Sequence, residues 1–94
     1  MVVESLFIKL KEDGIQPAEE ILEYYKNFKL SLPGCVRAYY ASSTINKHVY
    51  FIYAEFETMQ DYEHYRDKVN EKIQGKMPLE PYFANVPKMG VFEI

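Results

Sequence analysis

The chain has 94 residues, a length that suits one small domain over residues 1–94 and leaves no room for a second. Its 48% apolar and 27% charged residues are the balance of a folded globular protein and exclude a disordered tail. The formal net charge of −3 disfavours a nucleic-acid surface. The longest apolar run falls far short of the ~20 residues that cross a bilayer.

Cysteine usage and the start of the chain bear on its compartment. Cys35 is the only cysteine, so neither an internal disulfide nor a cysteine-built zinc site is expected. Residues 1–5 lack the basic region and the apolar core of a secretory signal. We therefore expect a cytoplasmic protein that makes no membrane contact. Nine tyrosines and no tryptophan make tyrosine the first side chain to examine for ligand recognition.

The first half of the chain predicts a strand, a helix and a second strand. Alternating apolar residues over 5–11 indicate the first strand, and Gly14 belongs to the segment that breaks it. Pro17 suits the first turn of a helix, which Gly34 ends in the left-handed conformation. The second strand is expected over 35–42. The buried stripe of the helix is expected to comprise Ala18, Ile21, Leu22, Tyr25, Phe28 and Leu32.

The second half predicts a central strand, a helix and a last strand. Residues 48–57 are apolar on both faces, as expected for a strand that is covered on two sides. Thr58 and Asp61 form the pattern of a capping box at the start of the second helix. Residues 80–84 are expected to be irregular, and residues 89–94 to form the last strand. The buried side of the second helix is expected to comprise Met59, Tyr62, Tyr65 or Arg66, Val69 and Ile73.

The predicted element order is β-α-β-β-α-β, which is one βαβ unit repeated around a turn near Asn46. Four strands with both helices on one face give a ferredoxin-like α+β sandwich with a four-stranded antiparallel sheet. The third strand carries Phe51 and Tyr53 on one side and Ile52 on the other, so the face that the helices leave open is apolar too. Because monomers rarely expose such a face, we expect a homodimer in which two sheets close into a barrel.

Several short motifs carry a resemblance to a known family. They are L-F-I-K-L-K at 6–11, P-G-C at 33–35, V-Y-F-I-Y-A-E-F-E-T at 49–58 and M-Q-D-Y-E-H-Y at 59–65. With the order of elements, they resemble the dimeric α+β barrel superfamily, and most closely the antibiotic-biosynthesis monooxygenase-like family. The stress-responsive A/B barrel family, which includes polyketide cyclases, is a close second. Members of the first family commonly carry Trp after the glutamate of the third strand and His nine residues later, where this chain has Phe56 and Tyr65.

The resemblance implies a homodimer with a small apolar pocket in each subunit and cofactor-free chemistry on phenols, quinols or polyketides. The first function to consider is a cofactor-independent monooxygenase, or a polyketide-cyclase-like enzyme, that acts on an aromatic or polyketide-like molecule. The alternative is a non-enzymatic ligand-binding or stress-associated dimer of the same fold. We expect no cofactor and no metal, since the sequence has no phosphate-binding loop and no metal-ligand spacing.

Histidine is the natural general base near neutral pH, and the sequence has two. His64 falls on the second helix beside Tyr62, and His48 opens the third strand at the rim of the sheet. The candidate catalytic residues are therefore His64 or His48 as the base and Tyr62 as a hydrogen-bonding group. A solvated surface position is the alternative for each histidine.

Aromatic residues and one glutamate supply the candidate substrate-binding groups. A phenol side chain offers apolar area and one hydrogen-bonding group, which suits an oxygenated aromatic ligand. Glu55 requires a partner such as Arg37 or Lys9, because an unpaired buried carboxylate is costly. Packing in the core or at the dimer interface is the alternative role for all of these side chains. The residues expected to line the pocket are Tyr39, Phe51, Tyr53, Glu55 and Phe56, with Leu6 and Ile8 as further apolar walls.

Overall fold

The computed structural model describes residues 1–72 and 78–94, so the predicted buried position of Ile73 lies outside the described residues. The elements in chain order are β1 (Val2–Lys9), the 3-10 helix η1 (Glu12–Gly14), α1 (Ile15–Leu30), β2 (Cys35–Ser42), β3 (Val49–Phe56), α2 (Met59–Lys72), the 3-10 helix η2 (Glu80–Tyr82) and β4 (Lys88–Glu93). The predicted order of strands and helices is confirmed. None of the helices in the described ranges is long and apolar enough to cross a membrane.

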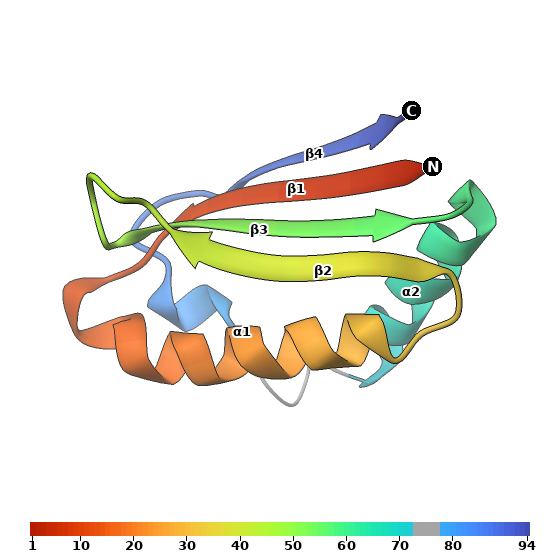
Figure 1. The fold of residues 1–94 in the computed structure, drawn as a ribbon. Coiled ribbons are helices and arrows are strands. Elements are labelled where there is room, and N and C mark those ends of the chain that lie inside the picture. Colours follow the sequence, from red (N-terminus) through yellow and green to blue (C-terminus); the bar gives the residue numbers. More distant parts are fainter. Residues whose placement is uncertain (73–77) are drawn as a thin grey trace.

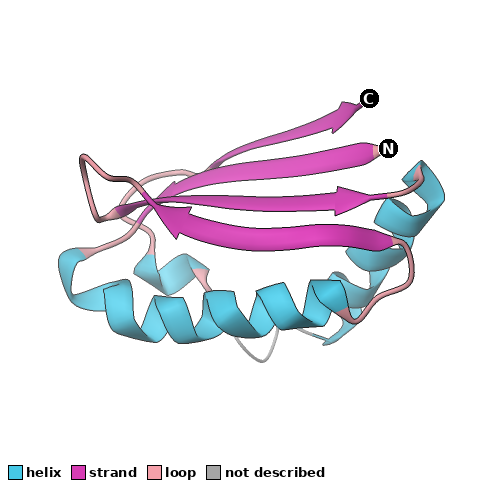
Figure 2. Cartoon of the chain, viewed as in Figure 1, coloured by secondary structure: helices cyan, strands magenta, loops and turns pink. Residues whose placement is uncertain are grey.

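The four strands form one antiparallel sheet in the order β2-β3-β1-β4. Both helices lie on the same side of this sheet, as Figures 1 and 2 show, so the fold is the expected ferredoxin-like α+β sandwich. β1 begins at Val2 rather than at residue 5, because Val2 pairs with Phe56 of β3 on one side and with Glu93 of β4 on the other. The earlier start matters for the site, since it brings Glu4 into the sheet.

The turns before and after the β2–β3 hairpin form as their residues predict. Gly34 has a φ of 81°, the left-handed conformation that glycine adopts without steric cost. The Thr58 hydroxyl donates to an Asp61 carboxylate oxygen over 2.9 Å, and the Asp61 amide donates back to that hydroxyl over 3.1 Å. The predicted cap of α2 is therefore confirmed.

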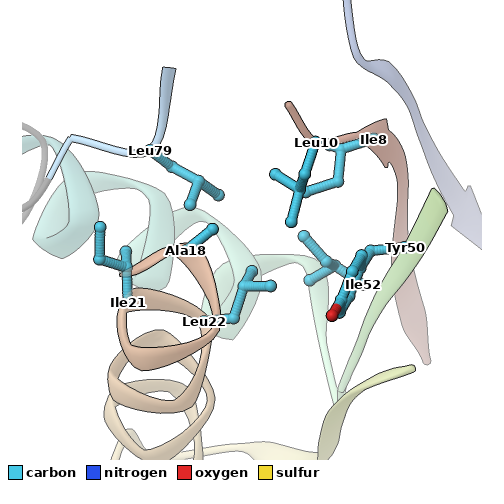
Figure 3. Packing of buried hydrophobic residues seen from close by; sticks show 8 residues of the cluster. All are labelled: Ile8, Leu10, Ala18, Ile21, Leu22, Tyr50, Ile52 and Leu79. Atoms are coloured by element: carbon cyan, nitrogen blue, oxygen red, sulfur yellow. The ribbon is translucent and has the colours of Figure 1, made fainter. Parts of the chain in front are cut away.

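The core consists of two clusters under the helix-covered face of the sheet. The first joins α1 to β1 and β3, and Figure 3 shows its members Ile8, Leu10, Ala18, Ile21, Leu22, Tyr50, Ile52 and Leu79. The second joins α2 to the other end of the sheet and comprises Val2, Ala38, Ala54, Phe56, Tyr62, Tyr65 and Val69. The expectation that Met59 is buried is wrong, because its position in the first turn of α2 leaves it 40% exposed.

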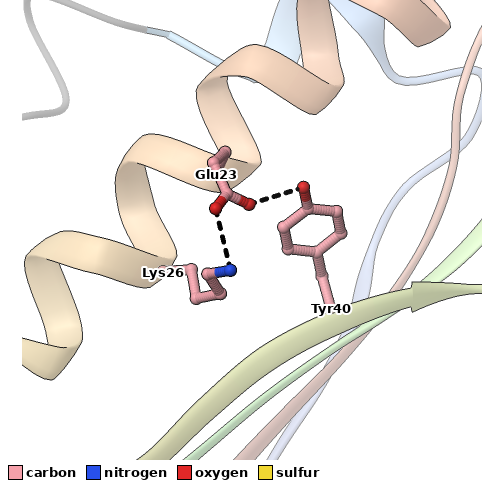
Figure 4. Close-up of polar contacts among 3 residues, drawn as sticks. All are labelled: Glu23, Lys26 and Tyr40. Carbon is pink, nitrogen blue, oxygen red and sulfur yellow. Dashed lines mark hydrogen bonds and ion pairs between the residues drawn. The ribbon is translucent and has the colours of Figure 1, made fainter.

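Two tyrosine–carboxylate hydrogen bonds tie α1 to the sheet. The Tyr40 hydroxyl of β2 donates to Glu23 over 2.8 Å, and Lys26 lies 2.8 Å from the other oxygen of that carboxylate (Figure 4). The Tyr50 hydroxyl of β3 donates to Glu19 one helical turn earlier. The helix is thus held against β2 and β3 by polar contacts at its flank as well as by the apolar stripe.

The side of the sheet that faces away from both helices, which we call the open face, carries a continuous group of aromatic rings. Phe7 lies 4.9 Å from Phe51, and Tyr39 stacks on Tyr53 at 4.9 Å between ring centres. The rings of Phe51 and Tyr53 are 5.8 Å apart and connect the two pairs. No described helix lies over this side of the sheet (Figure 2).

Candidate functional site

A cavity of about 280 Å³, which we call the interior cavity, lies between the sheet and the two helices, where the two core clusters meet. Its volume is near the lower end of the about 300–1,000 Å³ that is usual for small-molecule sites. The size suits a ligand of one or two fused rings. The apolar side chains that line the cavity include Leu6, Leu22, Ile52, Val69, Leu79 and Met89.

Glu4 of β1 is the centre of the polar contacts at the cavity wall. Its side chain is buried, and its Oε2 accepts a hydrogen bond of 2.7 Å from the Tyr62 hydroxyl of α2. The Arg66 guanidinium lies 3.7 Å from the same oxygen. Burial, together with the adjacent Glu4 carboxylate, raises the pKa of the Tyr62 phenol. Tyr62 therefore stays protonated and keeps donating to Glu4 at neutral pH.

Lys29 of α1 lines the same cavity as a buried amine, with only 5% of its surface exposed. Its Nζ lies over the ring of Tyr65, 5.7 Å from the ring centre. Burial lowers the pKa of Lys29, and the nearby Glu4 acts in the opposite direction. Burial also raises the pKa of Tyr65, so this ring is a neutral phenol across the physiological range. The cavity thus combines apolar walls with an amine whose pKa is below its ordinary value.

The sheet separates the predicted substrate-binding residues into two groups. Tyr39, Phe51, Tyr53 and Glu55 all lie on the open face, away from the interior cavity. Glu55 accepts a hydrogen bond of 2.5 Å from the Tyr53 hydroxyl. Within residues 1–72 and 78–94, Glu55 makes no ion pair with Arg37 or Lys9, although Arg37 lies opposite it in the β2–β3 pairing.

Phe56 and the predicted walls Leu6 and Ile8 lie on the helix-covered side. Leu6 lines the interior cavity, whereas Ile8 and Phe56 are fully enclosed in the core beside it. The Phe56 ring packs 5.1 Å from Tyr65, which is itself part of the cavity wall. Phe56 therefore supports the wall from behind.

The two histidines lie apart from each other and from the cavity. His64 is on the exposed side of α2, and His48 is half-buried beside the β2–β3 hairpin at the opposite end of the sheet (Figure 1). Neither histidine lines the interior cavity. Tyr62 does not line it either, but its hydroxyl donates to Glu4, which does. Among the described residues, no three His, Cys, Asp or Glu side chains come together in a way that could hold a metal ion.

Sequence reasoning missed Glu4 and Lys29, although each has a detectable signal. Glu4 shares its side of β1 with Val2, Leu6 and Ile8, so a strand that starts at Val2 places a carboxylate among inward-facing residues. Lys29 follows Tyr25 by four residues, which puts it on the apolar stripe of α1. A single charged residue among the inward-facing residues of a strand or on the apolar stripe of a helix indicates a buried charge.

Comparisons with known proteins agree with this geometry. Residues 1–70 match the sequence model of a family described as antibiotic biosynthesis monooxygenase. None of the curated proteins matches the chain.

Three solved structures illustrate the shared fold. A mutant of SnoaB, a cofactor-independent oxygenase from Streptomyces nogalater, has a TM-score of 0.82 at 13% identity, with 99% of this chain and 91% of that chain covered. Rv0793 from Mycobacterium tuberculosis has a TM-score of 0.86 at 9% identity, with coverage of 99% and 93%. A structure described as antibiotic biosynthesis monooxygenase has a TM-score of 0.85 at 6% identity, with coverage of 100% and 98%. At these identities the likeness shows the fold alone.

Proposed function

The chain belongs to the antibiotic biosynthesis monooxygenase family, and from this premise we propose that it binds an aromatic or polyketide-like molecule in the interior cavity and oxidises it with dioxygen, without a cofactor. The observation that carries the proposal is the cavity itself. Its walls are mostly apolar, and three of the titratable groups in its lining, Glu4, Lys29 and Tyr65, lie close together. Such a pocket suits an aromatic ring that bears an ionisable hydroxyl.

The chemistry asks two things of the protein. It must remove a proton from a phenol or an activated carbon, and it must hold the resulting anion away from water. Dioxygen then accepts electrons from the anion; oxidation of a ring methylene to a carbonyl leaves one oxygen atom in the product and the other in water. The apolar walls of the cavity reduce the contact of the anion with water, and the polar group around Glu4 orients the ring.

The working form is proposed to be a homodimer joined through the open face. Phe7 and Phe92 are more than half exposed in a single chain, although both lie on a sheet surface that is lined with aromatic rings. Monomeric proteins rarely expose a continuous apolar surface of this kind to water. A second copy with the same surface covers it through a twofold axis. Tyr39, Phe51, Tyr53 and Glu55 then belong to the interface.

A non-enzymatic ligand-binding role is the second candidate, and the positions of the histidines favour it. Neither His48 nor His64 lines the interior cavity, so no imidazole is available there as a base. A binding protein needs only the apolar walls and the hydrogen-bonding groups.

The two candidates are separated by incubating the purified protein with anthrones, quinols and linear polyketides while following oxygen consumption and absorbance. An enzyme consumes oxygen in step with product, whereas a binder changes the ligand spectrum without oxygen uptake. Met89→Trp narrows the cavity from the edge strand β4 and is expected to suppress either signal. Ile45→Trp, at the 96% exposed hairpin position, is the matched control. Signals that survive Met89→Trp would place the ligand elsewhere.

A further inference from the structure

The charged groups of the interior cavity differ in how well they are paired. Glu4 accepts from Tyr62 over 2.7 Å and lies 3.7 Å from Arg66, so its carboxylate has both a hydrogen bond and a cation. Arg66 in turn has Glu4. Both charges are therefore balanced without any ligand.

Among the described residues, Lys29 has no ion-pair partner of this kind. The residue is only 5% exposed, and in the described parts of the chain no carboxylate lies within ion-pair distance of its amine. The Nζ of Lys29 contacts the face of the Tyr65 ring, 5.7 Å from its centre, which compensates a buried cation only in part. An amine that is buried in the wall of a cavity, with no carboxylate among the described residues paired to it, is available to a ligand in that cavity.

The groups that surround Lys29 come from three elements. Glu4 reaches it from β1, Cys35 from the start of β2, and Tyr65 and Arg66 from α2. Burial is the largest influence and lowers the pKa of the amine; Arg66 lowers it further, whereas Glu4 and Cys35 raise it. The net effect is a lowered pKa, which shifts the amine toward its neutral form, the form that accepts a proton.

We propose that Lys29 is the base of the interior cavity: its Nζ takes the proton from the acidic hydroxyl of a phenol or enol and then holds the oxyanion as an ion pair. This inference rests on the proposed function, because it assumes that the cavity binds a ligand. In the step, the O–H bond of the ligand breaks and its electron pair stays on the oxygen. A new N–H bond forms on the amine, and the ammonium and the oxyanion attract each other at low dielectric.

The other titratable groups of the cavity are less suited to this role. The guanidinium of Arg66 has hydrogen-bond donors only and offers no acceptor to a hydroxyl. Glu4 already accepts from Tyr62, and raised pKa values keep the phenols of Tyr25 and Tyr65 protonated. Glu80 also lines the cavity, but a carboxylate that takes a proton becomes neutral and cannot pair with an oxyanion. Lys29 is the remaining group that can both take a proton and leave a positive charge beside the ligand oxygen.

The test uses 4-nitrophenol, a one-ring acidic phenol whose anion absorbs in the visible. Titration of the protein-bound probe is expected to give an apparent pKa at least one unit below that of the free probe, which is a tenfold stabilisation of the anion. Lys29→Met keeps the length of the side chain and removes the amine, so the shift is expected to disappear. Lys26→Met, which removes a partly exposed lysine of the same helix that does not line the cavity, is expected to leave the shift unchanged.

Two further measurements make the result decisive. If Lys29→Met does not fold, wild-type binding of 4-nitrophenol is compared with that of 4-nitroanisole, which has no proton to give; the phenol is expected to bind at least tenfold more tightly. Equal binding of the two probes, an unshifted pKa, or a full shift in folded Lys29→Met would overturn the role of Lys29. Oxygen uptake does not enter these readouts, so failure of the proposed oxygenase activity is recognised separately.

Discussion

The Tyr62 hydroxyl of α2 donates a 2.7 Å hydrogen bond to the Glu4 carboxylate of β1, and this buried contact joins residues 58 positions apart. It fixes the second helix against the sheet at the point where the interior cavity begins. Arg66, one helical turn after Tyr62, lies against the same carboxylate oxygen. One strand residue thereby positions two residues of α2, and the cavity wall depends on all three.

Tyr62→Phe is expected to lower the free energy of unfolding by about 1.5–3 kcal/mol, the usual cost of removing a hydrogen bond to a buried charged group. The ring contact with Phe56 at 5.7 Å is retained, so the loss reports on the hydroxyl. Urea denaturation measures the change. Tyr40→Phe removes the hydroxyl that donates to the exposed Glu23 and is expected to cost clearly less. Equal losses in the two variants would contradict a special role for the Glu4 contact.

Lys29→Met is expected to stabilise the folded chain by about 1–3 kcal/mol at neutral pH, because it replaces a buried amine, whose charged form is poorly paired, with an apolar side chain. The pKa of Lys29 is held below its ordinary value of 10.5 by burial. Between about this value and the lower pKa of the folded state, the unfolded chain binds a proton on this lysine and the folded chain does not. The free energy of unfolding of the wild-type chain therefore decreases as the pH falls through this window. The gain in the free energy of unfolding from Lys29→Met is therefore expected to be larger at pH 7 than at pH 10.

Thermal unfolding of both proteins across this pH range checks the expectation. Lys26→Met, which removes one partner of an exposed ion pair with Glu23, is expected to change stability by less than about 1 kcal/mol at every pH. A destabilised Lys29→Met variant would mean that the amine has a structural partner.

Gly34→Ala is expected to cost about 2–4 kcal/mol, for two reasons. An alanine at a φ of 81° is strained, and its Cβ would lie 2.2 Å from the Asp61 carboxylate, which belongs to the cap of α2. Denaturant melts of Gly34→Ala, Asp61→Ala and the double variant measure both contributions. The double variant is expected to lose less than the sum of the single changes, since Asp61→Ala removes the clash. Strict additivity would show that the clash is not the cause.

The sequence allowed the elements and the layers to be predicted, because local signals agreed with the fold. β2 was predicted at its observed bounds, and the Gly34 and Thr58 turn signals were both confirmed. The start of β1 was missed, since residues 2–4 are strand only through their pairing with β3 and β4. That error also hid Glu4, the centre of the polar contacts in the cavity.

The side of the sheet that holds the cavity could not be derived from alternation. A period of two shows that Phe51 and Tyr53 share one side and Ile52 lies on the other, but both sides of β3 are apolar. Only the packing of α1 and α2 decides which side is interior. For the same reason Tyr39 and Tyr62 were grouped in one predicted pocket, whereas the sheet lies between them.

Phe7→Glu tests the proposed dimer at the centre of the open face. Phe7 is 52% exposed in the single chain, and its ring lies 4.9 Å from Phe51. In a face-to-face dimer both copies would bury a carboxylate among aromatic rings, which is expected to weaken association by about 2 kcal/mol or more per copy. Sedimentation velocity should therefore show a wild-type dimer and a folded Phe7→Glu monomer at micromolar concentration. Ile45→Glu adds the same charge at the hairpin, away from the open face, and should remain dimeric. A wild-type protein that sediments as a monomer would leave the aromatic rings of the open face without a partner and would remove the reason for proposing the dimer.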